Sequence, residues 1–366
     1  MKVCHLTSVH PRYEIRIFFK ECQSLSKAGY DVSLIVADNK GDEIINNIKI
    51  IDVGKSKGRL RRMTQTIWRV YKKALKLDAD IYQFHDPELI FIGLLLKHKG
   101  KKVIYDIHED VPRAIFDKLW INKYLVILIS KIFERIENFI SKRLTYNVTA
   151  TPYLRDRFLK INKNTIDINN YPIISEFNNN DSWQEKKNEI CLTGSISEVR
   201  GIIQLINVLE ICDTRLHLAG EFSEPFLEEK VRLKKGWEKV IYYGFIGRDK
   251  VKQIFNESKI GMAIILPDKN LINGQPIKIF EYMSAGIPVI SSDFPLWKRI
   301  VENNNCGICV NPLDIQEIAK AINYLLNNEE EAKQMGLNGK RAIIDKYNWN
   351  KEEERLLKLY SELKKM

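Results

Sequence analysis

Residues Asn270 to Pro295 read NLINGQPIKIFEYMSAGIPVISSDFP, the order of loop, helix and buried strand found in an αβ unit. A polar loop leads to Pro276, and apolar side chains then recur at helical spacing as far as Gly286. The apolar run that follows Pro288 is typical of a buried strand. This segment therefore predicts an α/β fold.

The start of the predicted helix suits an anion. Proline is favoured at the first helical position, because its missing N–H would be unpaired there. The free N–H groups of the first turn face the loop of Asn273, Gly274 and Gln275, where a phosphate would be stabilised. Lys278 adds a positive charge, and Glu281, one turn on, can accept hydrogen bonds from a diol. The alternative is an ordinary αβ unit with a solvated Lys and Glu.

A second anion site is indicated by a loop between glycines, from Gly194 to Gly201. Small residues let the backbone approach a phosphate, and Arg200 supplies a permanent charge with forked donors. An arginine at a helix start opposes the helix dipole, which favours a bound anion over a plain surface arginine.

The chain is long enough for two domains, and both halves alternate strands with helices. The polar run Asn178 to Lys187 reads as a linker. We therefore expect an N-terminal domain over residues 1–175 and a C-terminal domain over residues 176–348.

Polar clusters follow three predicted strands of the first half. The loop after Lys2–Leu6 contains His10 and Arg12, and the next cluster is His85-Asp86. Because strand ends in such sheets converge on one edge, we expect the second cluster to share a cleft with the third, which contains His108. A structural hydrogen bond is the alternative for each histidine. The first loop lacks G-x-G-x-x-G, so a dinucleotide is disfavoured.

The third cluster also raises the question of a metal. His108 lies among Asp106, Glu109 and Asp110, but the spacing matches no strict ligand pattern. Cys306 and Cys309 form a lone CxxC without a second Cys or His pair, so two buried thiols are the better interpretation. We predict no metal and no cofactor.

The segment Asn270 to Pro295 resembles the donor-site signature of retaining, family 4 glycosyltransferases with the GT-B fold. The resemblance extends over nearly the whole chain, and its matching positions are Pro276, Glu281, Met283, Gly286, Pro288, Val289 and Ile290. It implies two Rossmann-like domains with parallel sheets facing across a cleft, and a last helix, residues 349–366, that crosses back to the N-terminal domain. The first acidic residue of the signature is replaced by Asn273.

The resemblance also implies site roles. Arg200 and Lys278 would bind the donor diphosphate, Glu281 the ribose, and Asn273 and His108 the transferred sugar. The residues implied for catalysis are His108, Asn273, Arg200 and Lys278. Those implied for donor binding are Gly194, Ser195, Arg200, Phe245, Ile246, Asn273, Gly274, Gln275, Pro276, Ile277, Lys278 and Glu281. On the acceptor side we place His10, Arg12, His85 and Asp86. Ser195 stands where relatives often carry a second basic residue, and we hypothesise that Lys278 compensates.

The net charge of +11 is concentrated in the first half, where residues 1–170 carry 31 Lys and Arg against 19 Asp and Glu. Lys55 to Lys76 contain nine basic residues and no acidic one, and the second part reads as an amphipathic helix. Three interpretations remain: a solvated helix face, attraction to anionic lipid, or binding of nucleic acid. No nucleic-acid-binding motif supports the third. We see no signal-peptide pattern and no apolar run of the ~20 residues that span a bilayer.

We therefore predict a hexosyltransferase that uses a nucleotide-diphospho-sugar, with UDP the expected nucleotide, and that retains the anomeric configuration without a metal. The acceptor would be a glycan or lipid-linked glycan of bacterial surface polysaccharide, such as lipopolysaccharide, O-antigen or capsule. The scattered cysteines favour a cytoplasmic location, and the basic N-terminal half fits a peripheral position on the inner membrane face. Two alternatives remain: a nucleotide-sugar epimerase of the same fold, which would show no acceptor-dependent transfer, and a non-catalytic scaffold, which Asn273 would suit.

Overall fold

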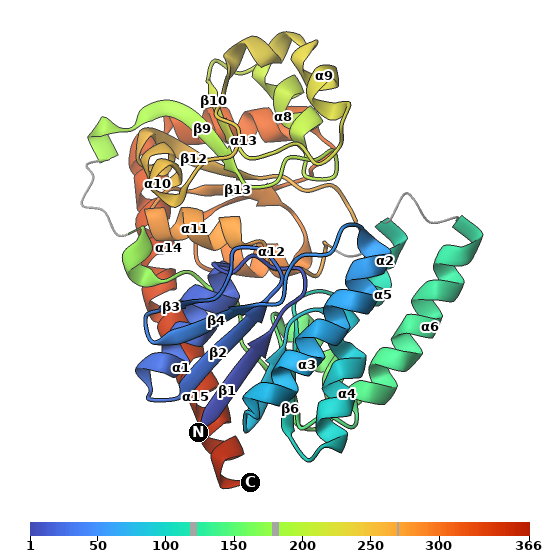
Figure 1. Ribbon diagram of the computed structural model, residues 1–366. Helices are drawn as coiled ribbons and strands as arrows, with labels where there is room; N and C mark the ends of the chain where they lie inside the picture. Colours follow the sequence, from blue (N-terminus) through green and yellow to red (C-terminus); the bar gives the residue numbers. More distant parts are fainter. Residues whose placement is uncertain (118–122, 178–182, 269–270) are drawn as a thin grey trace. The chain divides into compact units, whose positions relative to one another are not determined.

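The computed structural model describes residues 1–117, 123–177, 183–268 and 271–366 (Figure 1). The chain forms two compact units, residues 1–170 with 351–366, and residues 171–350. The boundaries thus fall after Asn170 and Asn350, where the sequence suggested 175 and 348. Much of the predicted linker lies outside the described residues, and its last residue, Lys187, already begins a strand.

The first unit is built on an eight-stranded sheet with the order β3-β4-β2-β1-β5-β6-β7-β8. Neighbouring strands are parallel except for the β3–β4 hairpin, which the sequence did not suggest. The strands are mostly apolar along their whole length because both faces are buried. They are β1 (Lys2–Leu6), β2 (Asp31–Val36), β3 (Glu43–Ile45), β4 (Ile48–Asp52), β5 (Ile81–Phe84), β6 (Lys102–Ile107), β7 (Tyr146–Thr149) and β8 (Thr165–Asp167).

Helices connect the parallel strands of this sheet. The first helical segment, Ile15–Cys22, has a wider π-type turn and continues into α1. The segment Arg62–Thr66 has the same turn and lies between α2 and α3. The helices are α1 (Gln23–Lys27), α2 (Arg59–Arg61), α3 (Ile67–Leu77), α4 (Ile90–His98), α5 (Val111–Ala114), α6 (Lys123–Ser141) and α7 (Pro152–Leu159). Single 3₁₀ turns lie at Pro87–Leu89 and Ile115–Asp117.

The last helix, α15 (Trp349–Lys365), joins the first unit from Lys351 onward. The buried Tyr360 donates a hydrogen bond through its hydroxyl to Gln83 Oε1 at 2.7 Å. Arg355 Nη2 lies 2.8 Å from Asp167 Oδ1. The helix therefore contributes both core packing and ion pairs to a unit whose other residues end at Asn170.

The second unit is built on a fully parallel six-stranded sheet with the order β11-β10-β9-β12-β13-β14. This is the strand order of doubly wound, nucleotide-binding sheets. Its strands are β9 (Lys187–Thr193), β10 (Leu216–Ala219), β11 (Val240–Tyr242), β12 (Ser258–Ala263), β13 (Val289–Ser292) and β14 (Gly307–Val310). Its helices are α8 (Ile202–Leu209), α9 (Leu227–Arg232), α10 (Arg248–Glu257), α11 (Ile277–Ala285), α12 (Pro295–Val301), α13 (Ile315–Asn327) and α14 (Glu329–Asp345). Single 3₁₀ turns lie at Ile174–Glu176, Trp183–Glu185 and Lys235–Lys239.

Each sheet has one point where the strand order reverses, and ligands of such sheets bind there, at the carboxyl ends of the strands. In the first unit this point lies between β1 and β5, and in the second between β9 and β12. The loops of the predicted site residues leave these same strands.

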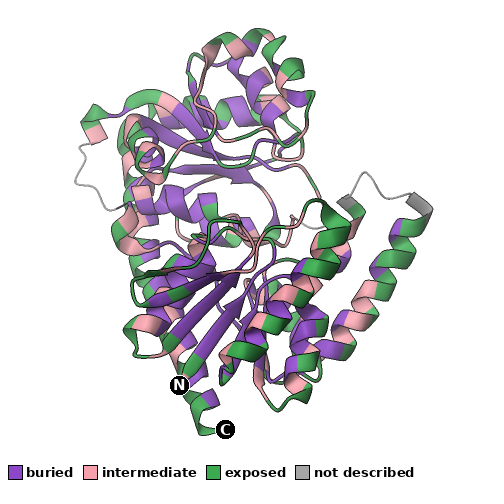
Figure 2. Ribbon diagram, in the orientation of Figure 1, coloured by how far each residue is buried: buried purple, intermediate pink, exposed green. Residues whose placement is uncertain are grey.

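The strands of both sheets are mostly buried, and the outer faces of the helices are exposed (Figure 2). All six cysteines are free thiols, as the sequence indicated. Within the described ranges, none of the helices combines the length and the apolar character needed to span a membrane.

Candidate functional site

The glycine-flanked loop after β9 is held at the switch point of the second sheet. Val199 O accepts a hydrogen bond from Leu266 N at 2.8 Å, which joins the loop to the segment after β12. Gly201 has a φ of 70°, and a Cβ there would lie 2.7 Å from Ile264 O. Only glycine fits this position, while Gly194 and Ser195 remain exposed at the start of the loop.

The 273–276 loop is fixed to the neighbouring helix. The fully buried Trp297 donates a hydrogen bond through Nε1 to Gly274 O at 2.8 Å. Helix α11 begins at Ile277, one residue later than predicted, with Pro276 as the preceding residue at a φ of −65°. Among the described residues, the N–H groups of Ile277 and Lys278 have no acceptor, and Gln275 Oε1 is buried without a partner.

Two basic side chains lie beside this helix start, the buried Lys278 and the partly buried Arg200. Lys278 is 7% exposed, and burial, with the nearby charge of Arg200, lowers its pKa to about 7 despite the opposing effect of Glu281. Burial also lowers the pKa of Arg200. Across the described ranges, neither side chain makes a hydrogen bond or an ion pair. Charges removed from water are normally paired, so a bound anion would stabilise these two basic groups and the free amides beside them.

Glu281 is engaged by a residue that the sequence did not reveal. Arg248, the first residue of α10, places Nη2 at 2.8 Å from Glu281 Oε1 and donates through Nε to Glu176 Oε1 at 2.6 Å. No local pattern pointed to Arg248, because its partners lie far away along the chain. Phe245, just before it, is 79% exposed in the loop implied for the nucleotide base, and Ile246 is partly buried. Asn273 is partly buried, with no hydrogen-bond partner in the described part of the chain.

In the first unit, Asp86 connects the loops after β1 and β5. Its Oδ2 accepts hydrogen bonds from Thr7 Oγ1 at 2.8 Å and from Ser8 N at 2.5 Å. His10 Nε2 lies 3.3 Å from Asp86 Oδ1. Arg12, by contrast, is buried, and it donates to both carboxylate oxygens of Asp38 at 2.7 Å and to Glu43. The structure thus places Arg12 in a structural ion-pair group.

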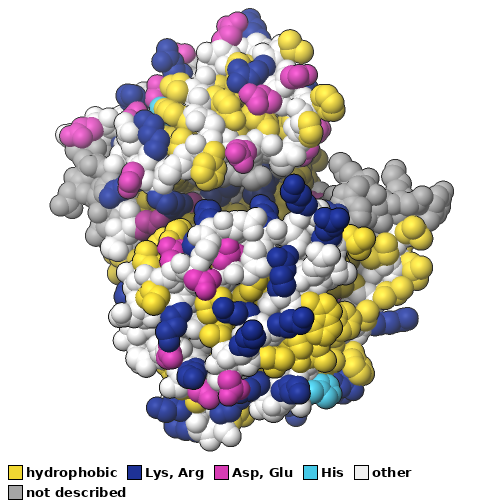
Figure 3. Space-filling view, in the orientation of Figure 1, with side chains coloured by type: hydrophobic (Ala, Val, Ile, Leu, Met, Phe, Trp, Pro, Cys, Tyr) yellow, Lys and Arg dark blue, Asp and Glu magenta, His cyan; other side chains and the backbone are white. Residues whose placement is uncertain are grey.

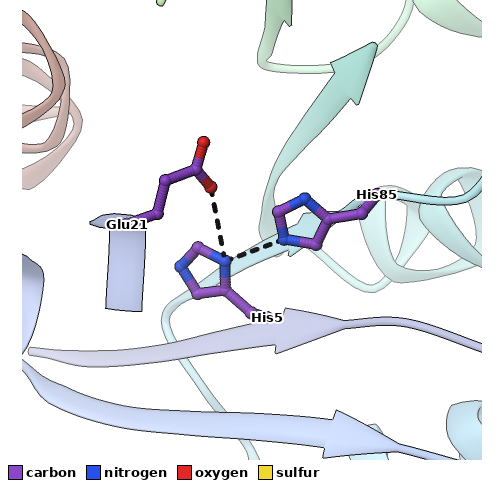
Figure 4. A group of neighbouring side chains, drawn as sticks. All are labelled: His5, Glu21 and His85. Carbon is purple, nitrogen blue, oxygen red and sulfur yellow. Dashed lines mark hydrogen bonds and ion pairs between the residues drawn. The ribbon is translucent and has the colours of Figure 1, made fainter. Parts of the chain in front are cut away.

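A chain of histidines lies under these loops. Figure 4 shows His5 between Glu21 and His85, with His5 Nδ1 at 2.9 Å from His85 Nε2. His85 Nδ1 lies 2.9 Å from Asp106 Oδ2, and His108 Nε2 lies 3.0 Å from the same oxygen. The expected meeting of the second and third clusters is therefore observed.

The positions of the imidazole protons in this chain of histidines follow from the ionised state of Asp106. Burial opposes the ionised form of Asp106, but the fork of Arg16, with Nη2 at 2.7 Å from Oδ1, and the histidines hold its pKa well below the usual range. An ionised carboxylate only accepts, so His85 donates through Nδ1 and His108 through Nε2. His85 Nε2 then accepts from His5 Nδ1. His108, whose side chain is 22% exposed, is left with Nδ1 as an acceptor.

The same atoms include two groups with the composition of metal sites. His5, Glu21 and His85 form one, and His85, Asp106 and His108 the other, with ligand atoms within 4.8 Å of one another. In both groups hydrogen bonds already use these atoms, and Arg16 occupies Asp106. A divalent ion would have to displace the Nδ1 proton of His5 in the first group, or the protons of His85 Nδ1 and His108 Nε2 in the second, so the geometry favours hydrogen bonding.

Two doubly wound units, each with its polar loops at the switch point, agree with the expected GT-B fold. Family models agree: Glycosyltransferase Family 4 matches residues 17–168, and Glycosyl transferases group 1 matches residues 174–342. The chain belongs to this group 1, family 4 type of glycosyltransferase, and the prediction of an enzyme of the hexosyltransferase class is confirmed.

Individual relatives are distant. An uncharacterized glycosyltransferase of Methanocaldococcus jannaschii is 25% identical over 202 residues, which span half of each chain. Sucrose-phosphate synthase from Thermosynechococcus elongatus has a TM-score of 0.80 at 15% identity, over 99% of this chain and 98% of the other. Anabaena HepE in complex with UDP-glucose has a TM-score of 0.75 at 14% identity, over 99% and 100%. These two structures confirm the GT-B fold.

Proposed function

We propose that the chain transfers a hexose from a nucleotide-diphospho-sugar, with UDP as the expected nucleotide, to a glycan or lipid-linked acceptor, with retention and without a metal. The observation that carries this proposal is the pair of unpaired basic side chains, the partly buried Arg200 and the buried Lys278, beside the free amides of α11. A departing diphosphate carries the charge that these groups stabilise.

The roles of the other residues follow from their places. Glu281 would accept hydrogen bonds from the ribose, and the exposed Phe245 would meet the base. Asn273 and His108 would orient the transferred sugar, His108 through its Nδ1 acceptor. The complex of HepE with UDP-glucose supports a UDP-sugar as donor.

A binding screen tests the donor site. Thermal shift and calorimetry with UDP, GDP, ADP and their sugar conjugates, each with and without EDTA, should show one nucleotide class stabilising the parent, independent of EDTA. Arg200→Ala should abolish the stabilisation. The matched control is Arg232→Ala, which removes an exposed arginine of the same unit that pairs with Glu228. If no nucleotide stabilises the folded parent, the non-catalytic scaffold becomes the better account. Binding without acceptor-dependent transfer would favour an epimerase.

We also propose that the first unit docks on anionic membrane, in keeping with an acceptor of surface polysaccharide. A hollow of about 880 Å³ is lined by the basic segment, including Lys57, Arg61 and Lys72, with Trp68 at its side and 53% exposed. Figure 3 shows basic and hydrophobic side chains next to each other on this face. Helix α6 adds large exposed apolar side chains, namely Leu125, Ile127, Leu128, Ile129, Ile132 and Phe139. A basic face beside an exposed apolar one is typical of interfacial binding.

Vesicle sedimentation separates docking from a merely solvated face. Arg62 pairs with Glu88, and Arg69 donates a hydrogen bond to Val53 O, so neither arginine is substituted. Replacing four exposed cations by Gln (Lys57, Arg61, Lys72 and Lys76) should reduce binding to phosphatidylglycerol vesicles and leave nucleotide binding unchanged. Equal vesicle binding by parent and variant would refute membrane docking through this segment.

A further inference from the structure

Arg248 joins three parts of the second unit that are far apart in sequence. It follows directly on the loop implied for the base, and its guanidinium lies 4.9 Å from the ring centre of Phe177. Its Nη2 is 2.8 Å from Glu281 Oε1, and its Nε donates to Glu176 Oε1 at 2.6 Å. We infer that Arg248 is a positioning residue that fixes Glu281 for the ribose diol and so sets the preference for a ribonucleotide. This inference rests on the proposed function.

The need for such a residue follows from the charges of the site. Burial lowers the pKa of Lys278, and Glu281 lies near enough to offset part of that effect, so Glu281 would stand near a diphosphate bound at Lys278. Two negative groups at short range repel each other, and a carboxylate in that position tends to turn away or take up a proton. Arg248 offsets this repulsion, because its charge favours the ionised carboxylate.

The geometry leaves one carboxylate oxygen of Glu281, Oε2, available to a ligand. Arg248 pairs with Oε1, and in the described part of the chain Oε2 accepts no hydrogen bond. The Glu281 side chain is 10% exposed. An ionised carboxylate offers several acceptor positions, so Oε2 can accept from ribose hydroxyls while Oε1 stays bound to Arg248.

Glu176 acts as the anchor of Arg248. Its side chain is 27% exposed, and it lies on the short helical turn Ile174–Glu176 near the start of the unit. With Glu176 on one side and Phe177 beneath, the guanidinium has one preferred direction. A lysine could keep the charge of Arg248 but not hold both carboxylates with a rigid fork.

Calorimetry with paired nucleotides tests the inference. We would titrate UDP and 2′,3′-dideoxy-UDP, with GDP and dideoxy-GDP in parallel, into the parent, Arg248→Ala, Arg248→Lys and the control Arg232→Ala. The parent should prefer the ribonucleotide. Arg248→Ala should lose on the order of ten-fold in affinity for the ribonucleotide, as expected for a lost charged hydrogen bond, and little for the dideoxynucleotide. Arg248→Lys should fall between, and the control should match the parent.

The outcomes separate the two proposals. If the parent binds no nucleoside diphosphate, the proposed function fails and this inference fails with it. If the parent prefers the ribonucleotide and Arg248→Ala keeps the full preference, only the role of Arg248 is refuted. Equal losses for both nucleotides would likewise refute it. If Arg248→Ala does not fold, Arg248→Lys is the test: a reduced preference for the ribonucleotide would support the role of Arg248, and the full preference of the parent would refute it.

Discussion

Replacing Lys278 by Met should stabilise the unliganded protein while removing its nucleotide site. Burial and the charge of Arg200 lower the pKa of Lys278 from 10.5 to about 7. At ~1.36 kcal/mol per pH unit, this difference corresponds to about 5 kcal/mol, of which about 4 kcal/mol act at pH 7, where the side chain is half protonated. Methionine has a similar shape without the charge, so unfolding at pH 7 should become less favourable by up to about 4 kcal/mol.

The pH dependence provides the sharper assay. Between pH 7 and 10.5 the unfolded chain holds the Lys278 proton and the folded protein does not, so the stability of the parent rises with pH in this window. Lys278→Met should lack that rise. Urea unfolding at pH 7 and pH 9 would measure it, with Lys298→Met as the control at a side chain that is 44% exposed. Equal stability of parent and variant at pH 7, with equal pH dependence, would refute the assignment of Lys278 as a buried, unpaired cation.

Three further changes probe the loops and the histidine chain. Trp297→Phe should weaken nucleotide binding by about 1 kcal/mol in calorimetry, because the 273–276 loop loses its hydrogen bond; unchanged affinity would show that the loop is held otherwise. Gly201→Ala should lower the free energy of unfolding by about 2 kcal/mol or more, against a smaller loss for Gly29→Ala, where a Cβ meets no atom within 4 Å. Asp106→Asn should change the His108 tautomer, visible in imidazole ¹⁵N shifts; unaltered shifts would contradict the deduced proton positions.

The sequence predicted the fold class and most of the strands and helices, because the parallel sheets carry uninterrupted apolar runs bounded by glycine and polar loops. It also indicated anion sites at the loops Gly194–Gly201 and 273–276, and the structure places both loops where the strand order of the second sheet reverses. The hairpin of β3 and β4 was not predicted, because its exposed edge strand β3 lacks a distinct pattern of apolar residues.

Long-range pairs were beyond the reach of local patterns. Arg248 meets Glu281 and Glu176 only after the sheet has formed. Arg12 was expected on the acceptor side because it lies in a polar loop, but the structure pairs it with Asp38. Periodicity and motif spacing report which face of an element is buried, not which distant charge lies opposite.

The return of α15 to the first unit has a consequence for the order in which the protein matures on the ribosome. The hydroxyl of Tyr360, the buried Leu356 and Leu363, and the partner of Asp167 all lie in α15, which follows the whole second unit in the chain. The unit that is synthesised first therefore waits for the whole second unit before its own core is closed. A premature stop in the final helix would leave the second sheet complete and damage the N-terminal one.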